Sequence, residues 1–321
     1  MEAKSMSVAE YTSLLDGTDV DPIELLGDDY ESFGKGIRAS RAMVETWIIS
    51  FEMIRQQDPY ASDLLSRMAF FDRQAIPREF LAYDEKNAGQ EIDERVLTSA
   101  LGTLKRFSFI STGKDQTFDM HRLVQLVSQK WLIRDRMAER FAIEALRAVS
   151  YVFPEATYEN WATCSKYLAH ATAVLRSVKP GKRQIRRDRV QVLDKIASYF
   201  EIVGEWKSAE EYLIEARRLT ADIKGQGHLD TLVYTARLAS TYWNQGRWDE
   251  AETLEVQVLE RMKKKLGADH PDTLTIMGNL ASTYWNQGRW DEAETLDVQV
   301  LERRMKKLGA DHPDTLAIWA T

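Results

Sequence analysis

Apolar positions recur every three or four residues along most of the chain, which is the spacing of one buried helix face. One stretch breaks this rhythm: the short runs SFIS (108–111) and TFDM (117–120) flank the glycine-containing loop 112–116, which predicts a β-hairpin. Helices, then a hairpin, then a closing helix predict a winged-helix domain at residues 59–133, after a helical segment at 1–58. The helical runs lie at 8–15, 21–26, 39–57, 60–71, 76–81, 92–107 and 121–132.

The C-terminal part of the chain repeats itself with a period of 42 residues. Residues 228–269 and 270–311 are identical at 33 of 42 positions, and a third copy opens at residue 312 and stops at 321. A degenerate copy at 186–227 precedes them, since Trp206 falls on Trp248 after a shift of one period. Such self-similarity predicts stacked units that bury their apolar faces against one another. We expect an α-solenoid at 186–321, joined to the winged helix by a helical connector at 134–185.

Each unit is predicted to be a pair of antiparallel helices. In the copy at 270–311, Asp272 is expected to cap the first helix, Gly288 to end it, and Trp290 to begin the second. Trp290 and its counterpart Trp248 are expected in the core between helices. Three histidines recur at the junctions between copies, too far apart to share a metal ion, and are expected to be structural: His228, His270 and His312.

The composition fits a mainly α protein and excludes several classes of site. The chain is 44% apolar with a net charge of −7 and interspersed signs, which argues against a nucleic-acid surface. Cys164 is the single cysteine, so no intrachain disulfide or cysteine-based zinc site can form. No spacing predicts a catalytic constellation, a metal site or a cofactor. Without a signal peptide or membrane span in the sequence, we predict a cytoplasmic protein.

One basic stretch stands out from this balanced pattern. Residues 179–189 read KPGKRQIRRDR, and Pro180-Gly181 breaks the preceding helical pattern. We predict a solvated linker here. Contact with a phosphate or an acidic partner is the alternative interpretation.

The repeat units resemble tetratricopeptide repeats of the kinesin-light-chain type. The segment LASTYWNQGRWDEAETL occurs at 238–254 and again at 280–296, and carries the LA..Y...G...EA pattern of such repeats. The resemblance implies a right-handed superhelix whose first helices line a concave groove for peptides or partner proteins. Packing by the recurring tryptophans is the alternative to partner contact. Mapped onto that pattern, the groove residues are Arg237, Ser240, Trp243, Asn244, Asn279, Ser282, Trp285 and Asn286.

The N-terminal half resembles fungal STAND proteins, which are NLR-like signalling NTPases with an NB-ARC module. The resemblance rests on WIISFE (47–52), LLSRMAFFD (64–72) and MHRLVQ (120–125). It implies that His121 matches a histidine that senses the bound nucleotide's phosphate. However, no G-x-x-x-x-G-K-[ST] loop occurs in the chain, so we expect no nucleotide hydrolysis and read His121 as a domain-interface residue or a remnant. The ends of the sequence favour a fragment of a longer protein.

These observations favour a non-catalytic interaction module, the sensor half of a STAND-type protein that binds a protein or peptide on its repeats. One alternative is a nucleotide-dependent NTPase whose P-loop lies outside this chain. A kinesin-light-chain-like cargo adaptor is another, and DNA binding through the winged helix a third. Self-association through an uncapped repeat end is a further expectation.

Overall fold

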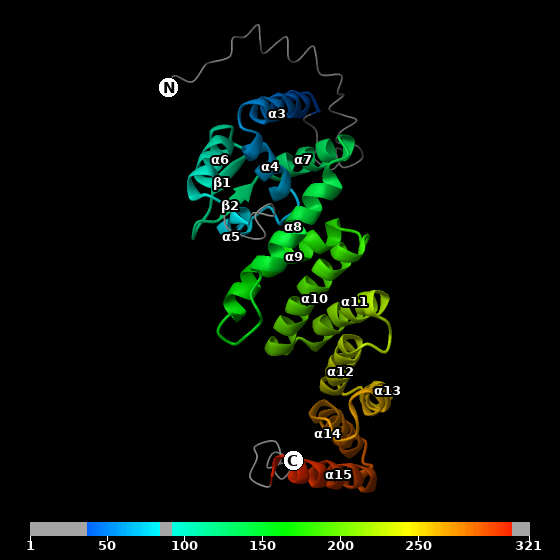
Figure 1. Cartoon of the computed structure of the whole chain (residues 1–321). Coiled ribbons are helices and arrows are strands. Elements are labelled where there is room, and N and C mark those ends of the chain that lie inside the picture. The colour runs from blue at the N-terminus through cyan, green and yellow to red at the C-terminus, as the bar shows by residue number, and fades with distance from the viewer. Residues whose placement is uncertain (1–36, 84–91, 310–321) are drawn as a thin grey trace. The chain divides into compact units, whose positions relative to one another are not determined.

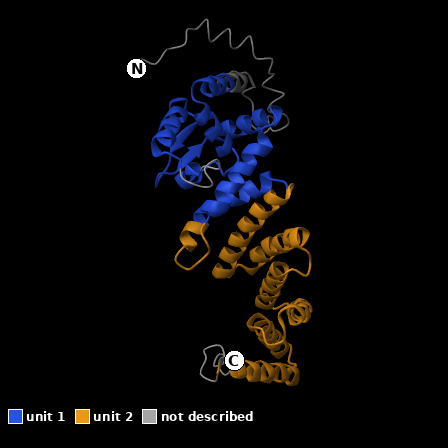
Figure 2. Ribbon diagram, viewed as in Figure 1, with its two compact units in different colours: residues 1–153, 165–179 blue, residues 154–164, 180–321 orange. Residues whose placement is uncertain are grey.

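The computed structural model describes residues 37–83 and 92–309 (Figure 1). Within these ranges it contains thirteen helices and one two-stranded antiparallel sheet, so the prediction of a mainly α fold is confirmed. The chain divides into two compact units (Figure 2): one reaches Phe153 and includes Ser165–Lys179, and the other comprises Pro154–Cys164 and the chain from Pro180. The helical runs expected at 8–15 and 21–26 and the truncated copy at 312–321 lie outside the described residues.

Proline and aspartate set the first helix boundaries of the first unit. Asp58 separates α3 from α4, and its Oδ1 accepts a hydrogen bond from the Ala61 backbone nitrogen at 3.0 Å. Pro59 stands at the first position of α4, where a missing N–H costs nothing. The helices of this unit are α3 (Ile37–Gln57), α4 (Pro59–Met68), α5 (Arg78–Ala82), α6 (Glu94–Arg106), α7 (Arg122–Arg134), α8 (Ala138–Val152) and the larger part of α9 (Trp161–Ser177).

The predicted hairpin is present between α6 and α7. Strands β1 (Ile110–Thr112) and β2 (Phe118–Met120) pair antiparallel, with Ser111 opposite Asp119. Ile76 adds a bridge to Phe118 through two backbone hydrogen bonds of 2.8 and 2.9 Å. Phe118 is buried, as are Phe71 and Phe80, whose rings stack 5.3 Å apart. The hairpin is therefore confirmed, whereas the winged-helix assignment stays a prediction.

The second unit contains three successive helical hairpins. The pairs are α10 (Arg183–Val203) with α11 (Trp206–Lys224), α12 (Leu229–Asn244) with α13 (Trp248–Leu266), and α14 (Pro271–Asn286) with α15 (Trp290–Leu308). Each turn between paired helices contains a glycine with a left-handed backbone, such as Gly246 at φ 75° and Gly288 at φ 77°. Side chains other than glycine seldom adopt this conformation, which explains why the glycine recurs with the repeat.

Successive hairpins pack through buried aliphatic side chains. The core between the second and third hairpins includes Leu232, Val258, Met277 and Val300, all at most 1% exposed. Helix α11 packs on α12, and α13 packs on α14. Burial of this kind stabilises each hairpin only when a neighbour is present, which is the expected behaviour of a repeat array.

Histidine, and not the expected aspartate, caps the first helix of each clear copy. The Nδ1 atoms of His228 and His270 accept hydrogen bonds of 3.2 Å from the backbone nitrogens of Asp230 and Asp272. Asp272 instead lies inside the first turn, where its charge favours the positive end of the helix dipole. The structural role expected for these two histidines is confirmed, whereas His312 lies outside the described residues.

The predicted linker at 179–189 is wrong for most of its length. Helix α10 begins at Arg183, so the basic run is helical after Lys182. Arg189 is buried and its Nε donates to Glu215 on α11 at 2.7 Å. Counting charges alone missed this helix, because the apolar Ile185, Val192 and Ile196 give it a buried face.

Candidate protein-interaction site

The last turns of α12 and α14 place the same three predicted groove residues in the same way. Trp243 and Trp285 are 36% and 60% exposed, so both are available on the surface. Asn286 Nδ2 donates to the Ser282 carbonyl at 2.8 Å, and Asn244 does the same to Ser240. Among the described residues, the amide oxygen of each asparagine has no hydrogen-bond partner. Each turn therefore presents an indole ring beside a fixed amide that can bond a peptide backbone.

The Arg237 side chain lies on the same helix but is bound within the protein. It forms ion pairs with Asp194 and Glu201 of α10, the latter at 2.6 Å, and donates to Ser198 Oγ at 2.9 Å. Burial lowers the pKa of Arg237, but hydrogen bonds and charge from Glu201 and Asp194 outweigh burial and raise it. Its counterpart Asn279 is uncharged and half-buried. Arg237 therefore holds two first helices together, which is a structural role that its sequence position did not reveal.

A cavity of about 460 Å³ lies beside Arg237, where α10, the end of α11 and α12 meet. Apolar and charged side chains both line it, among them Val190, Ile223, Tyr234 and Asp194. Burial, followed by the charge of Asp194, raises the pKa of Tyr234, so its phenol stays neutral. The cavity therefore lies between two first helices and the second helix that connects them.

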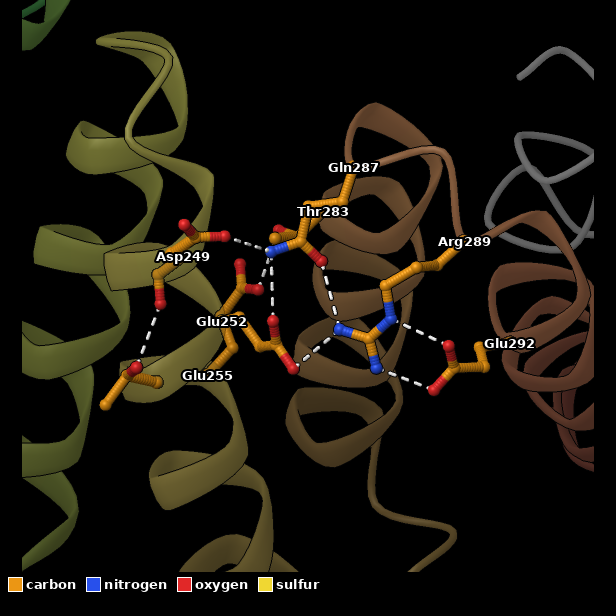
Figure 3. Close-up of polar contacts among 8 residues, drawn as sticks. Asp249, Glu252, Glu255, Thr283, Gln287, Arg289 and Glu292 are labelled. Carbon is orange, nitrogen blue, oxygen red and sulfur yellow. Dashed lines mark hydrogen bonds and ion pairs between the residues drawn. The ribbon is translucent and has the colours of Figure 1, made fainter.

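A polar cluster that the sequence analysis missed fixes each hairpin to the one before it (Figure 3). Arg289 Nη1 donates to Glu252 on α13 at 2.8 Å, and Gln287 Nε2 donates to the same carboxylate at 2.9 Å. Arg289 also forms an ion pair with Glu292 on α15 at 2.6 Å and stacks over the ring of Tyr284 at 3.9 Å. Burial raises the pKa of Glu252, but Arg289 and Gln287 outweigh this effect and lower it.

The preceding copy repeats the cluster one period earlier. Gln245 and Arg247 donate to Glu210 on α11 at 2.9 and 2.8 Å, and Arg247 stacks over Tyr242 at 4.0 Å. The recurring tripeptide Gln-Gly-Arg is the sequence signal that could have revealed this cluster. The cluster links the turn after Trp243, and the turn after Trp285, to the preceding hairpin. It therefore fixes the position of each exposed indole relative to that hairpin.

A second missed feature is a buried carboxyl group between α13 and α14. Glu255 is 2% exposed, and its Oε2 accepts a hydrogen bond of 2.7 Å from the Thr283 hydroxyl. Burial raises the pKa of Glu255 to about 7, and the negative charge of Glu252 adds to this shift against the opposing bond from Thr283. The equivalent position one copy earlier is Leu213, which is fully buried. Only the comparison of aligned copies could have revealed this substitution.

The prediction that Trp248 and Trp290 lie in the core is wrong. Their side chains are 36% and 63% exposed, because each stands at the first position of a second helix, at the rim of its hairpin. The ring of Trp290 lies near that of Trp285, with centroids 6.5 Å apart and planes inclined by 49°. The core positions of these helices are instead taken by Ala251 and Ala293, both fully buried.

His121 lies in the first unit, away from any of these residues in sequence. It caps α7: its Nδ1 accepts a hydrogen bond from the Leu123 backbone nitrogen at 3.2 Å. Its ring centroid lies 6.0 Å from that of Trp47. The capping bond gives His121 a structural role, and its action as a nucleotide sensor stays a prediction.

Comparison with known families identifies the repeats. The family described as Tetratricopeptide repeat matches residues 188–264, 233–302 and 272–321. The second unit therefore carries tetratricopeptide repeats, as the recurring LASTYWNQGRWDEAETL segment predicted. Its degenerate copy is included in the match from residue 188 onward.

The chain is also similar to a named fungal protein. A "Nucleotide-binding leucine-rich repeat (NLR)-like protein" of Hyaloscypha variabilis is 38% identical over 214 residues, which is 65% of this chain and 20% of that protein. The predicted resemblance to NLR-like proteins is thereby confirmed. The chain spans about a fifth of the length of this relative.

Two solved structures show partial likeness. Kinesin light chain nearly identical TPR-like repeats of Podosopora anserina are 23% identical, with a TM-score of 0.41, and the match covers 56% of this chain and 81% of theirs. BtubC (BKLC) from P. vanneervenii is 14% identical, with a TM-score of 0.43, over 60% of this chain and 74% of its own.

Proposed function

We propose that the chain is a non-catalytic interaction module that binds a protein or peptide partner along the first helices of its repeats. The observation that carries this proposal is the pair of matching surface sets on α12 and α14. Ser240, Trp243 and Asn244 recur as Ser282, Trp285 and Asn286, and α12 and α14 contact one another directly. Two contact sets of the same residue types at a fixed spacing suit an extended peptide that lies across successive helices.

The two copies differ in a way that supports recognition of one particular partner. Five of their nine differences are consecutive, at 233–237 against 275–279, whereas the turn and nearly all of the second helix are the same. Val233 and Ala236 of the copy at 228–269 are replaced by Thr275 and Gly278 in the copy at 270–311. A repeat array with constant anchors and variable intervening positions can bind a partner whose sequence is not itself repetitive.

The kinesin-light-chain-type sequence pattern, in which first helices line a concave face, supports this choice of groove residues. The cavity beside Arg237 adds a pocket at one end of this surface. Tetratricopeptide repeats and the NLR-like relative support a cytoplasmic signalling role. Among the described helices, none is long and apolar enough to cross a membrane. Within that role the chain would form the sensing part and would lack nucleotide hydrolysis of its own.

The double variant Trp285→Ala/Asn286→Ala is expected to reduce partner capture by about 10-fold or more, because it removes a large exposed ring and a fixed amide together. Immobilised wild-type and variant chains would be compared for capture from a lysate of the source organism, with quantitative mass spectrometry. The matched control is Glu260→Ala/Glu302→Ala, two exposed positions on second helices. Equal capture by the groove variant and the wild type, with unchanged melting temperatures, would sink the proposal.

A second candidate function follows from the name of the Hyaloscypha relative. It is described as nucleotide-binding, so this chain would be the regulatory part of a nucleotide-dependent switch. The capping role of His121, whose ring nitrogen already accepts a backbone hydrogen bond, gives it no free contact on that side. A rise in the melting temperature of this chain with millimolar ATP or ADP would favour direct nucleotide binding over the interaction module alone.

A further inference from the structure

Four tryptophans mark the rim of the array where first helices turn into second helices. Trp243 and Trp248 flank the turn of the second hairpin, and Trp285 and Trp290 flank that of the third. Trp243 and Trp248 are each 36% exposed although a complete hairpin follows them, so packing of the next unit leaves part of this rim accessible. Exposed indoles repeated at one edge indicate an interaction surface, since exposed apolar groups that gather in a patch mark such surfaces.

Carboxylates follow two of these tryptophans, Trp248 and Trp290, in the sequence. The first turn of α13 contains Asp249 and Glu250, and that of α15 contains Asp291 and Glu292. Glu294 lies four residues after Trp290, and therefore on the same side of α15. Asp291 and Glu294 are exposed and form no ion pair among the described residues. The rim thus combines aromatic faces with unpaired negative charge.

The positive charges at this rim are already neutralised. Arg247 forms ion pairs with Glu210 and Glu250, and Arg289 forms ion pairs with Glu252 and Glu292. Each guanidinium also stacks on a tyrosine ring. Neither arginine can therefore offset the charge of Asp291 or Glu294. A cationic side chain of a partner would therefore contact the tryptophan rings beside carboxylates that no arginine neutralises.

We propose that this rim, defined by Trp243, Trp248, Trp285 and Trp290 with Asp291 and Glu294, binds a basic segment of a partner protein. A lysine or arginine side chain lies against the Trp285–Trp290 pair, whose rings are 6.5 Å apart and inclined by 49°. Tryptophan gives the strongest cation–π attraction, and arginine also stacks on its plane. The carboxylates add attraction at longer range. The inference rests on the proposed function, because it names the chemistry of a partner that reaches Trp285.

The test uses a fluorescein-labelled peptide of about twelve residues with alternating lysine and serine, its arginine form and its glutamate form. Fluorescence polarisation with the full chain would measure affinity at about 50 and about 300 mM NaCl. We expect the lysine and arginine peptides to bind and the glutamate peptide not to bind. Trp290→Ala should weaken binding about 5- to 20-fold, and Trp290→Phe should restore part of that loss.

The charge contribution has its own matched pair of variants. Asp291→Asn/Glu294→Gln should weaken binding about 3- to 10-fold and flatten its salt dependence, because it removes the unpaired carboxylates. Glu260→Gln/Glu302→Gln changes the net charge equally on other exposed second-helix positions and should stay within about twofold of the wild type. Equal losses in both double variants would mean general electrostatic attraction and would overturn the proposal.

Three further outcomes would also overturn it: binding of the glutamate peptide as tight as that of the lysine peptide, no binding of any basic peptide, or unchanged affinity in Trp290→Ala. Sedimentation velocity tests whether a second copy of the chain occupies the rim instead. A dimer that Trp290→Ala abolishes would assign the rim to a second copy of the chain and exclude the basic segment. Because Trp290 is outside the groove variant, loss of peptide binding and loss of partner capture can be separated.

Discussion

Raising the pH from about 5 to about 8 is expected to destabilise the repeat array by about 2.5 kcal/mol through Glu255 alone. The carboxyl group is buried between α13 and α14, and burial raises its pKa from the ordinary 4.5 to about 7. An acid whose pKa is higher in the folded state than in the unfolded state binds its proton more tightly when the protein folds. Its stabilising protonated form is complete below about pH 4.5 and is lost as the pH rises through 7.

The variant Glu255→Gln isolates this contribution. Glutamine keeps the size of the side chain and can still accept the hydrogen bond from Thr283, but carries no charge. It should match the wild type near pH 5 and exceed its free energy of unfolding by about 2–3 kcal/mol near pH 8. Urea denaturation followed by circular dichroism would measure both chains across this range.

Glu260→Gln provides the control on the same helix, because Glu260 is exposed. Its pH profile should coincide with that of the wild type. Parallel profiles for the wild type and Glu255→Gln would show that Glu255 titrates normally in the folded protein.

Replacing Arg237 by alanine should lower the free energy of unfolding by about 2–3 kcal/mol. The substitution leaves the carboxylates of Asp194 and Glu201, both partly buried, without their shared cation. The side chain of Arg237 is 24% exposed, so solvent relieves part of the cost of a fully buried pair. Thermal or urea denaturation of the two chains would measure the difference.

Asn279→Ala is the matched control for this prediction, because Asn279 occupies the equivalent position on α14 without an ion pair. It should change stability by less than about 1 kcal/mol. The pair of variants also separates two roles. If Arg237→Ala reduced partner capture while leaving stability unchanged, Arg237 would be a contact residue and its role as a link between helices would be wrong.

The sequence contained enough to predict the repeats but less to predict their polar interior. A period of 42 residues, the recurring glycine at 246 and 288 and the regular apolar spacing are local features, so they identify helical hairpins directly. The SFIS and TFDM runs likewise identify the β-hairpin. The division of the chain into four segments and the winged-helix assignment stay predictions, since the contacts of the described residues give two compact units.

The failures have two causes: the exact start of a helix, and the side chains that a neighbouring helix places across from a residue. Trp290 looked like a core residue by its type, but its place at the start of α15 leaves it on the rim. His270 replaced Asp272 as the cap because the helix begins two residues earlier than a cap at Asp272 would place it. Arg237 has a groove position by pattern, yet two acids of the preceding first helix bind it. The first two cases needed the exact start of the helix, and the third needed the preceding first helix to be known.

Site-specific cross-linking tests the central claim, partner binding on the first helices of the repeats, most directly. A photoreactive phenylalanine derivative would replace Ser282 on α14 in one chain and Glu260 on α13 in another, both irradiated with the captured partner. If the partner binds the first helices, a covalent adduct of chain and partner forms from position 282 and none forms from position 260. An adduct from position 260 alone would place the partner on the second helices and contradict binding on the first helices.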